Sequence, residues 1–432
     1  MVCRKYYIKT MGCQMNLYDG QRMESMLTGR GFIKTASMSD ADVIILNTCS
    51  VREKATEKVF SELGRIRNAK KSDAIFGITG CVAREVDRNA FSRIRGLNFV
   101  LGPQSYHKLR DVIENPDARH LHVDLSGLEK YDAMPKMTSS ELSAYIPVQE
   151  GCSHCCTYCI VPYTRGPEVS RPFDDCLKDA RMAAQQGAKE ICLLGQNVNG
   201  YKYNLAALIR EVAQIDGIYR IRYTSSYPTE MTDELIALHG VEPKLLPFLN
   251  LPVQSGSPSV LRRMNRPYDI DEYLSIVNRV KETGTQISSD FIVGFPGETD
   301  DDFNATCDIA RLVGYINSYS FKYSRRPHTA AANMPDQVSE EIKKSRLAIL
   351  DGILNDNQRA FNESCVGQVF ECLFERDDGR GNVIYRTPHM VQVILPSLAS
   401  WQPSDNTISS VAIVKIKITA ANKSSLRGEL CD

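Results

Sequence analysis

The chain has neither an excess of charge nor a long apolar segment. Lys plus Arg and Asp plus Glu both number 52 among the 432 residues, so the net charge gives no indication of a nucleic-acid partner. The longest apolar run, near residues 74–83, is broken by two glycines and is much shorter than a membrane span. The first residues, Met1–Lys5, do not open a signal peptide. These absences predict a cytoplasmic protein with no membrane segment.

Cysteine, in contrast, is frequent. The chain has 14 cysteines, and because thiols stay reduced in the cytoplasm they indicate metal binding or catalysis rather than disulfides. Cys152, Cys156 and Cys159 have the spacing Cys-x3-Cys-x2-Cys, in a short loop after a predicted strand at 143–149. Three thiolates on one tight loop can hold three irons of a cubane cluster and leave the fourth iron open to a small molecule. This spacing is the signature of the radical S-adenosylmethionine (SAM) enzymes, which the chain resembles here.

Cys155 leaves a second interpretation of this loop open. Cys152 with Cys155, and Cys156 with Cys159, also form two CxxC pairs, and four thiolates at that spacing can close a structural zinc site. Adjacent side chains at 155 and 156 would point in different directions, which makes a shell of four thiolates awkward. The cluster is the favoured interpretation, and a zinc-binding RNA-associated protein is the non-enzymatic alternative.

The first 118 residues have the pattern of repeated strand–helix units. Helical periodicity follows several short apolar runs that are rich in β-branched and aromatic residues. Strands that alternate with helices indicate a doubly wound parallel sheet in an α/β domain, here predicted for residues 3–118. The predicted strands are 6–10, 43–47, 75–79 and 99–101.

Three more cysteines lie at the ends of these predicted strands. Cys13, Cys49 and Cys81 each follow a strand by two or three residues. Because the carboxyl ends of parallel strands share one edge of a sheet, the three thiols should converge there. We therefore predict a second three-thiolate cluster; the alternative is that they are small buried residues at strand ends.

A partial barrel is predicted for residues 138–363. The polar segment 119–137 lacks clear periodicity and is predicted to be a linker. Six βα units then follow and indicate a partial barrel with its chemistry at the carboxyl ends of the strands, where the loop with Cys152 also lies. The predicted strands are 143–149, 190–194, 219–224, 247–252, 287–293 and 317–323.

Glycines and polar side chains follow several of these strands. Glycine lets the backbone approach a ligand closely, and amide or carboxylate oxygens can accept a hydrogen bond from an ammonium group. Together with the cysteine loop, these turns resemble the SAM contacts of radical-SAM barrels. The resemblance assigns SAM binding to Gly195, Gln196, Asn197, Gly294, Gly297 and Glu298.

Residues 364–430 are predicted to form a small all-β barrel. After a long helical stretch at 339–361, the pattern changes to short strands separated by turns. This region has no visible excess of basic residues, so charge does not indicate that it binds RNA. We interpret Phe374, Tyr385 and Trp401 as core or surface filling rather than as stacking platforms for bases.

Two three-cysteine sites followed by a β-barrel resemble the methylthiotransferases over nearly the whole chain. That family has an N-terminal cluster domain, a radical-SAM barrel and an RNA-binding barrel called TRAM. The segments Gly12–Asn16, Asn47–Ala55 and Tyr158–Gly166 resemble the branch that acts on isopentenylated tRNA rather than the ribosomal-protein branch. Leu261–Tyr268 also resembles the tRNA branch. Its arginines are predicted to pair with phosphate, although a solvated helix face is the alternative; they are Arg262, Arg263 and Arg266.

Three features depart from the family pattern. Cys155 stands where a bulky or polar residue is expected inside the loop, and Tyr227 stands where histidine is more usual. The last barrel matches the family best only at its end, 411–430.

The resemblance implies a reaction and its cofactors. Cys152, Cys156 and Cys159 would hold the [4Fe-4S] cluster that cleaves SAM, and the other three cysteines an auxiliary [4Fe-4S] cluster that carries the sulfur. SAM would be both methyl donor and radical source. The implied product is 2-methylthio-N6-dimethylallyladenosine at position 37 of the tRNA anticodon loop, made by a monomer with unidentified electron and sulfur donors. Another tRNA adenosine or a ribosomal protein is the alternative substrate.

Overall fold

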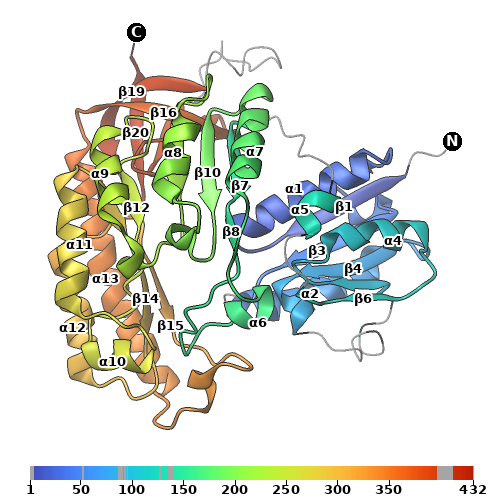
Figure 1. Cartoon of the computed structure of the whole chain (residues 1–432), viewed down its shortest axis with the longest axis horizontal. Helices are drawn as coiled ribbons and strands as arrows, with labels where there is room; N and C mark the ends of the chain where they lie inside the picture. The colour runs from blue at the N-terminus through green and yellow to red at the C-terminus, as the bar shows by residue number, and fades with distance from the viewer. Residues whose placement is uncertain are drawn as a thin grey trace.

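The structure is a computed structural model that describes residues 4–50, 53–85, 91, 94, 96–125, 129–134, 141–396 and 412–431. It consists of an N-terminal α/β domain, a central partial barrel with helices outside it, and a small closed β-barrel at the C-terminal end (Figure 1). The predicted fold class is confirmed. No helix in the described ranges combines the length and apolarity that crossing a membrane needs.

The N-terminal domain is built on a six-stranded parallel sheet of order β2-β1-β3-β4-β5-β6. The two central strands are buried along their whole length, which explains their continuous apolar runs. Helices cover the sheet on both sides, and each face has its own apolar core. The elements are β1 (Lys5–Thr10), α1 (Gln14–Thr28), β2 (Ile33–Lys34), β3 (Val43–Thr48), α2 (Glu53–Ala69), β4 (Ile75–Gly80), η2 (Cys81–Arg84), β5 (Phe99–Leu101), α4 (Leu109–Glu114) and β6 (His120–His122).

The predicted linker at 119–137 is wrong in part. β6 lies within it and adds an edge strand to the N-terminal sheet beside β5. Further along, α5 (Glu129–Ala133) brings the side chain of Lys130 into a fully buried site. An edge strand and a short interface helix need few apolar residues, so this segment is polar. Its sequence therefore shows no hydrophobic periodicity from which β6 or α5 could be predicted.

The central barrel contains the six predicted strands in parallel order. β7 (Ser143–Pro147), β10 (Glu190–Leu194) and β11 (Arg220–Tyr223) form one sheet, and a bridge between Ile221 and Leu245 leads on to β12 (Phe248–Asn250). β12 pairs with β13 (Gln286–Ser288), and β14 (Asp290–Val293) pairs with β15 (Tyr319–Lys322). The outer helices include α7 (Phe173–Gln185), α8 (Leu205–Ala213), α9 (Asp233–Val241), α11 (Ile270–Glu282) and α12 (Asp300–Val313).

The long helix α13 (Glu340–Ser364) leads to a closed antiparallel and parallel barrel of order β16-β17-β18-β20-β19. Tyr385 lies in its core, and Phe374 packs edge-on against it with ring centroids 5.7 Å apart. Trp401 lies outside the described residues. The strands are β16 (Val369–Asp377), β17 (Asn382–Arg386), β18 (Gln392–Pro396), β19 (Ile413–Ala421) and β20 (Ser425–Leu430).

The C-terminal barrel closes the amino-terminal end of the central barrel, opposite α6 (Val161–Arg165) (Figure 1). Glu190, at the start of β10, accepts hydrogen bonds from Arg222 and from Arg386, each at 2.9 Å. Arg220 donates to the main-chain oxygens of Arg386 and Glu371. The side chains of Glu190, Arg220, Arg222 and Arg386 are buried, so charged contacts join the two barrels.

Candidate functional site

The cysteines predicted to hold the SAM-cleaving cluster, here called the loop triad (Cys152, Cys156 and Cys159), lie between β8 (Gln149–Glu150) and α6. Gly151 opens the loop with φ +78°, and a Cβ there would lie 2.1 Å from the oxygen of Pro167. Only glycine fits this turn. The three cysteines are partly exposed. Burial, together with the charge of Cys156, raises the pKa of Cys152 to about 11 and that of Cys159 to about 12.

The buried side chain of Arg266 supports this loop. Its guanidinium lies 3.8 Å from the Cys156 sulfur and donates at 2.8 Å to the carbonyl oxygen of Pro252. It also stacks on the rings of Tyr227 and Tyr268, at 4.7 and 5.1 Å. Arg266 is only 5% exposed. The prediction that it binds RNA phosphate is therefore wrong, because its charge is used inside the protein and no face of it is open to a nucleic acid.

Cys155 differs from its neighbours in the loop. Its side chain is exposed and its backbone is left-handed, with φ +49°. Its carbonyl oxygen accepts a hydrogen bond of 3.2 Å from Asn265.

Among the described residues, no three His, Cys, Asp or Glu side chains have the geometry to hold a single metal ion. Cluster ligands differ from the ligands of one ion, because each thiolate binds its own iron.

The other three cysteines, here called the sheet triad (Cys13, Cys49 and Cys81), lie at one edge of the N-terminal sheet, after β1, β3 and β4. A Cβ at Gly12 would lie 2.2 Å from the Cβ of Cys49, so glycine there lets two of the cysteine segments approach each other. A hydrogen bond with Cys49, helped by the charge of Arg165, lowers the pKa of Cys13 to about 6. Burial raises the pKa of the Cys81 thiol. The predicted convergence of strand ends thus occurs.

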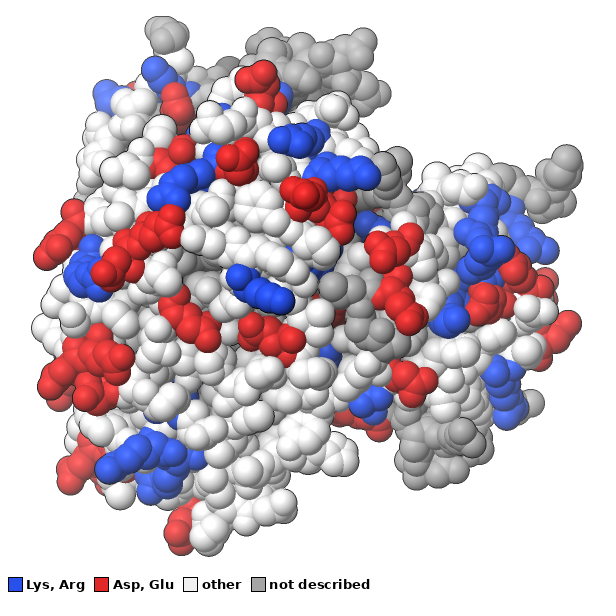
Figure 2. All heavy atoms as spheres, viewed as in Figure 1, with Lys and Arg blue, Asp and Glu red and all other residues white. Residues whose placement is uncertain are grey.

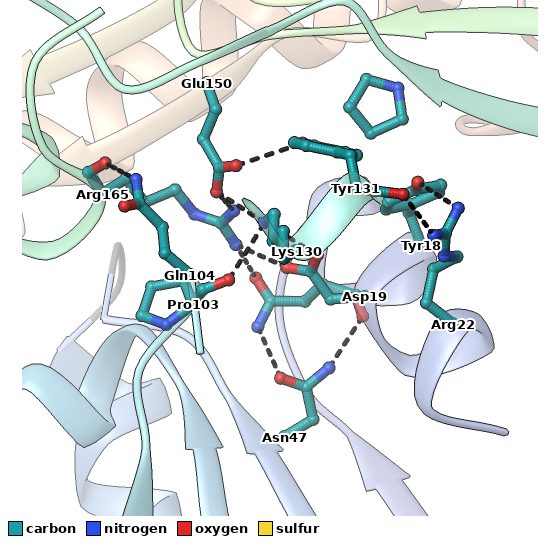
Figure 3. Close-up of polar contacts among 12 residues, drawn as sticks. Tyr18, Asp19, Arg22, Asn47, Pro103, Gln104, Lys130, Tyr131, Glu150 and Arg165 are labelled. Carbon is teal, nitrogen blue, oxygen red and sulfur yellow. Dashed lines mark hydrogen bonds and ion pairs between the residues drawn. The ribbon is translucent and has the colours of Figure 1, made fainter. Parts of the chain in front are cut away.

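A buried polar network joins the N-terminal domain to the start of the cysteine loop and to α6 (Figure 3). Arg165, the last residue of α6, pairs with Glu150 at 2.8 Å and with Asp19 of α1 at 3.0 Å. Lys130 of α5 pairs with the same carboxylates, at 2.8 Å to Glu150 and 3.4 Å to Asp19. Tyr131 donates to the second oxygen of Glu150 at 3.1 Å. All four charged side chains are at most 2% exposed, so the network fixes the contact between the two domains.

The turn predicted to bind SAM after β10 is held against the base of the cysteine loop. Gln149 accepts hydrogen bonds from the amides of Gln196 and Asn197, at 2.9 and 3.1 Å. Gln196 in turn accepts from the amide of Gly151 at 2.6 Å. Gly195 lets the Gln149 amide pack closely, since a Cβ there would lie 2.7 Å from its oxygen. The turn therefore lies next to Cys152, and its contact with SAM stays a prediction.

The second predicted SAM turn, at 294–298, makes internal contacts. The carboxylate of Glu298 accepts from the amide of Gly294 at 2.6 Å and pairs with Arg346 of α13 at 2.7 Å. Gly297 faces the guanidinium of Arg263, which would lie 2.9 Å from a Cβ there. In the described structure this turn ties strand β14 to the outer helices, and its role toward SAM also stays a prediction.

A cavity of about 280 Å³ opens beside Cys159. Its lining includes Tyr158 and Ile160 of the cysteine loop, Ile292 of β14 and Tyr323. Gln254 and Asp290 add polar groups, and Lys322 and Arg326 add cationic ones. The backbone of Gln254 is left-handed, with φ +70°. A cavity of mixed apolar and polar lining at the carboxyl ends of barrel strands suits a small ligand.

The two other predicted RNA-binding arginines are the last two residues of the short helix α10 (Pro258–Arg263). Arg262 is exposed, whereas Arg263 is partly exposed and lies 3.5 Å from Asp302. Figure 2 shows basic side chains gathered over α10 and a second basic group on the N-terminal domain, while the two signs of charge are mixed between them. The local patch, rather than the balanced total charge, is the feature that suits a phosphate backbone.

Known proteins match the whole chain. A protein named tRNA-2-methylthio-N(6)-dimethylallyladenosine synthase from Rickettsia canadensis is 46% identical over 99% of this chain and 99% of its own length. A protein of the same name from Sphingopyxis alaskensis is 44% identical over 99% of this chain and 97% of its own. The chain belongs to this family of radical-SAM methylthiotransferases.

Matches to parts of the chain agree with this family. Residues 146–310 match the Radical SAM superfamily, and residues 5–102 match a family described as uncharacterized protein family UPF0004. The radical-SAM methyltransferase TsrM from Kitasatospora setae has a similar fold, with a TM-score of 0.59, 13% identity and coverage of 77% of this chain and 74% of that one. At that identity the likeness concerns the fold alone.

Membership of the family implies a [4Fe-4S] cluster and SAM, and the N-terminal domain suggests a second cluster. Both triads fit such groups, since each offers soft thiolate ligands close enough to influence one another's ionisation. The sequence did not reveal the charged network of Asp19, Lys130, Glu150 and Arg165. The sequence shows only that charged residues stand near both cysteine motifs. It does not show that Asp19 pairs with Lys130 and Arg165, which lie more than a hundred positions away along the chain.

Proposed function

We propose that this protein methylthiolates carbon 2 of N6-isopentenyladenosine at position 37 of tRNA. The observation that carries the proposal is the 46% identity, over 99% of both chains, to a protein named for this product. The conjunction of two cysteine triads held in adjoining domains supports it. Carbon 2 of adenine has a strong C–H bond and no acidic proton, so a general acid or base cannot activate it, whereas a radical can remove the hydrogen atom.

In this proposal each domain has one task. The sheet triad holds the auxiliary cluster, in a domain that includes β6 and so extends past residue 118. Residues 138–363 form the radical-SAM core and 364–430 the TRAM-like barrel. The loop triad holds the cluster that, when bound with SAM, supplies the radical chemistry. The protein is a cytoplasmic monomer that takes electrons and sulfur from other donors.

The chain's own residues orient the ligands. The turn at 195–197 is hydrogen-bonded to the base of the cysteine loop and is proposed to hold SAM next to Cys152. The cavity beside Cys159 is proposed to receive the rest of SAM, with Gln254 as a polar contact. The turn at 294–298 keeps its proposed role as a close backbone contact, while Glu298 fixes its shape.

The tRNA is proposed to lie over α10. Arg262 and Arg263 then neutralise phosphates near an unpaired loop whose base can enter the protein. Replacing Arg262 with Gln should lower the slope of log K against log salt by about one and leave SAM cleavage intact. Arg266→Gln, in contrast, should not change that slope, because its side chain is buried.

Turnover of prenylated and unprenylated tRNA by the reconstituted protein tests the proposal. Five apolar carbons, at ~0.8 kcal/mol for each buried methylene-sized group, give a preference of up to about 4 kcal/mol. That corresponds to about a thousandfold. Nucleoside mass spectrometry should therefore show the methylthio product only from prenylated tRNA. Equal turnover of both substrates, or turnover of a ribosomal protein instead, would refute the assignment.

A further inference from the structure

Arg165 belongs to the radical-SAM domain and pairs with Asp19 of the N-terminal domain. It ends helix α6, which begins two residues after Cys159 in the radical-SAM domain. Its side chain, however, reaches into the N-terminal domain and is only 2% exposed. Helix α6 packs against η2, whose first residue is Cys81.

The guanidinium lies beside the sheet triad. Helix α6 packs on η2, and the positive charge of Arg165 acts to lower the pKa of both Cys13 and Cys81, although burial raises that of Cys81 overall. It also approaches Asn16 at 3.4 Å, and the oxygen that it approaches accepts from the Cys13 thiol at 3.3 Å. The amide nitrogen of Asn16 donates to the carbonyl of Thr48, next to Cys49, at 2.6 Å. One side chain is thus linked to all three segments that carry the sheet triad.

The same guanidinium is held by the loop that carries the other triad. Glu150, which pairs with it at 2.8 Å, precedes Cys152 by two residues. Gln104 of the N-terminal domain donates to the main-chain oxygen of Arg165 at 2.7 Å, so the backbone of α6 is fixed as well. A planar donor with five N–H groups can make these contacts at once, whereas the single ammonium of lysine cannot.

We propose that Arg165 is a positioning residue that sets the sheet triad against the loop triad and donates to a sulfur of the auxiliary cluster. The inference rests on the proposed function only in taking Cys81 as a cluster ligand. Donors in the second shell raise the reduction potential of an iron–sulfur cluster and orient its ligands. Arg165 therefore couples SAM cleavage to sulfur transfer without contacting the substrate.

The first test isolates the auxiliary cluster. In a variant with all three loop-triad cysteines changed to Ala, only that cluster remains, and its midpoint potential can be measured by redox titration followed by electron paramagnetic resonance. Adding Arg165→Gln should shift the midpoint to a more negative value, and Arg165→Lys should shift it less. An unchanged midpoint in Arg165→Gln would overturn the proposal, and so would the absence of iron from the background variant.

The second test uses the chain with both triads intact. Arg165→Gln should raise the ratio of 5′-deoxyadenosine to methylthiolated nucleoside at least about fivefold, while the KM for SAM stays the same. An unchanged ratio would overturn the proposal. The midpoint needs no tRNA, so failure of the proposed substrate is distinguishable from failure of this inference.

Two further variants control for folding. Arg386→Gln removes a buried arginine of similar pairing, bound to Glu190 at the opposite end of the central barrel, and should change neither the midpoint nor the ratio. The double variant Arg165→Gln, Glu150→Gln removes one charge of each sign, so it leaves Asp19 paired with Lys130 and avoids an unbalanced buried charge. It should fold and still show a negative shift, though a smaller one, because the loss of the Glu150 charge acts in the opposite direction; a wild-type midpoint there would contradict the role of Arg165.

Discussion

The two cysteine triads offer the same three thiols but are assembled in opposite ways. The loop triad comes from one short segment, and its shape depends on a glycine turn and on Arg266 of the same domain. The sheet triad comes from the ends of three neighbouring strands, and Arg165 of the other domain completes it. Individual thiols differ in ionisation: the pKa of Cys152 in the loop triad is raised to about 11, whereas in the sheet triad that of Cys13 is lowered to about 6 and burial raises that of Cys81.

The difference shows that one site can form inside its own domain, whereas the other depends on docking. A local loop needs only its own strand and turn. A site made from strand ends needs the whole sheet first, and here it also needs a guanidinium from a neighbouring domain. Mutations should therefore affect the loop triad locally and the sheet triad through the interface.

The largest effects should follow from removing either triad. Changing all three loop-triad cysteines to Ala should leave a folded protein with about half the iron and no SAM cleavage, because each cluster takes its thiolates from one domain. The matching change in the sheet triad should keep 5′-deoxyadenosine formation and abolish methylthiolation. Iron analysis and product assays measure both. Loss of all iron from either variant would contradict the independence of the two sites.

A smaller effect is expected at Arg266. Arg266→Gln leaves the Pro252 carbonyl and the Tyr268 hydroxyl without their buried donor, and should lower the free energy of unfolding by about 2–4 kcal/mol. Denaturant unfolding of the iron-free protein measures this change. Iron should be lost mainly from the loop triad, next to Cys156. Arg262→Gln, an exposed change nearby, should alter stability by less than about 0.5 kcal/mol; equal destabilisation by both variants would argue against the buried role.

Thiol reactivity should separate the triads in the iron-free protein. At pH 7 most of the Cys13 thiol, with its pKa of about 6, is thiolate, so iodoacetamide should modify it at least about tenfold faster than Cys152. The rate at Cys13 should fall as the pH drops through 6, because the thiolate is protonated. Peptide mass spectrometry in a Cys155→Ser background avoids competition from another exposed thiol.

Cys49→Ala tests the cause of that reactivity. It removes the hydrogen bond that lowers the pKa of Cys13, so the pH midpoint of alkylation should move up toward the ordinary range of a thiol. A midpoint that stays near 6 would mean that Arg165, and not Cys49, controls the ionisation.

The smallest effect is expected at Cys155. Its side chain is exposed, so Cys155→Ser should keep both clusters and most activity. Iron content and SAM binding by equilibrium dialysis measure this. If SAM binding were lost, Cys155 would be a ligand and the boundaries of the loop triad would have to be redrawn.

The sequence predicts elements well where local patterns are strong. All six barrel strands were predicted, from runs that range from the fully buried β10 to the partly exposed β15. Ser289 separates β13 from β14; it donates to the carbonyl of Leu251 and accepts from the amide of Val253. The short edge strands β2 and β6 were missed, since two or three partly exposed residues carry no periodicity.

Charged residues show the opposite behaviour. The cysteine spacings indicate both triads, because ligand spacing is a local property. For Arg266 the sequence gives the charge but not the direction of the side chain, and the phosphate-binding prediction was wrong for that reason. Arg165 and Asp19 are 146 positions apart, so no local pattern indicates that they pair.

The contact between the two barrels has a consequence for truncation and grafting. Arg220 is buried, and its acceptors are two main-chain carbonyls of the C-terminal barrel, while Glu190 takes a guanidinium from the same barrel. A chain that ends after α13 would lack those acceptors, and Arg220 would lie on a newly exposed surface without them. The last barrel is thus not a detachable accessory. A foreign barrel could replace it only if it offered carbonyls on the same backbone path and an arginine in the place of Arg386.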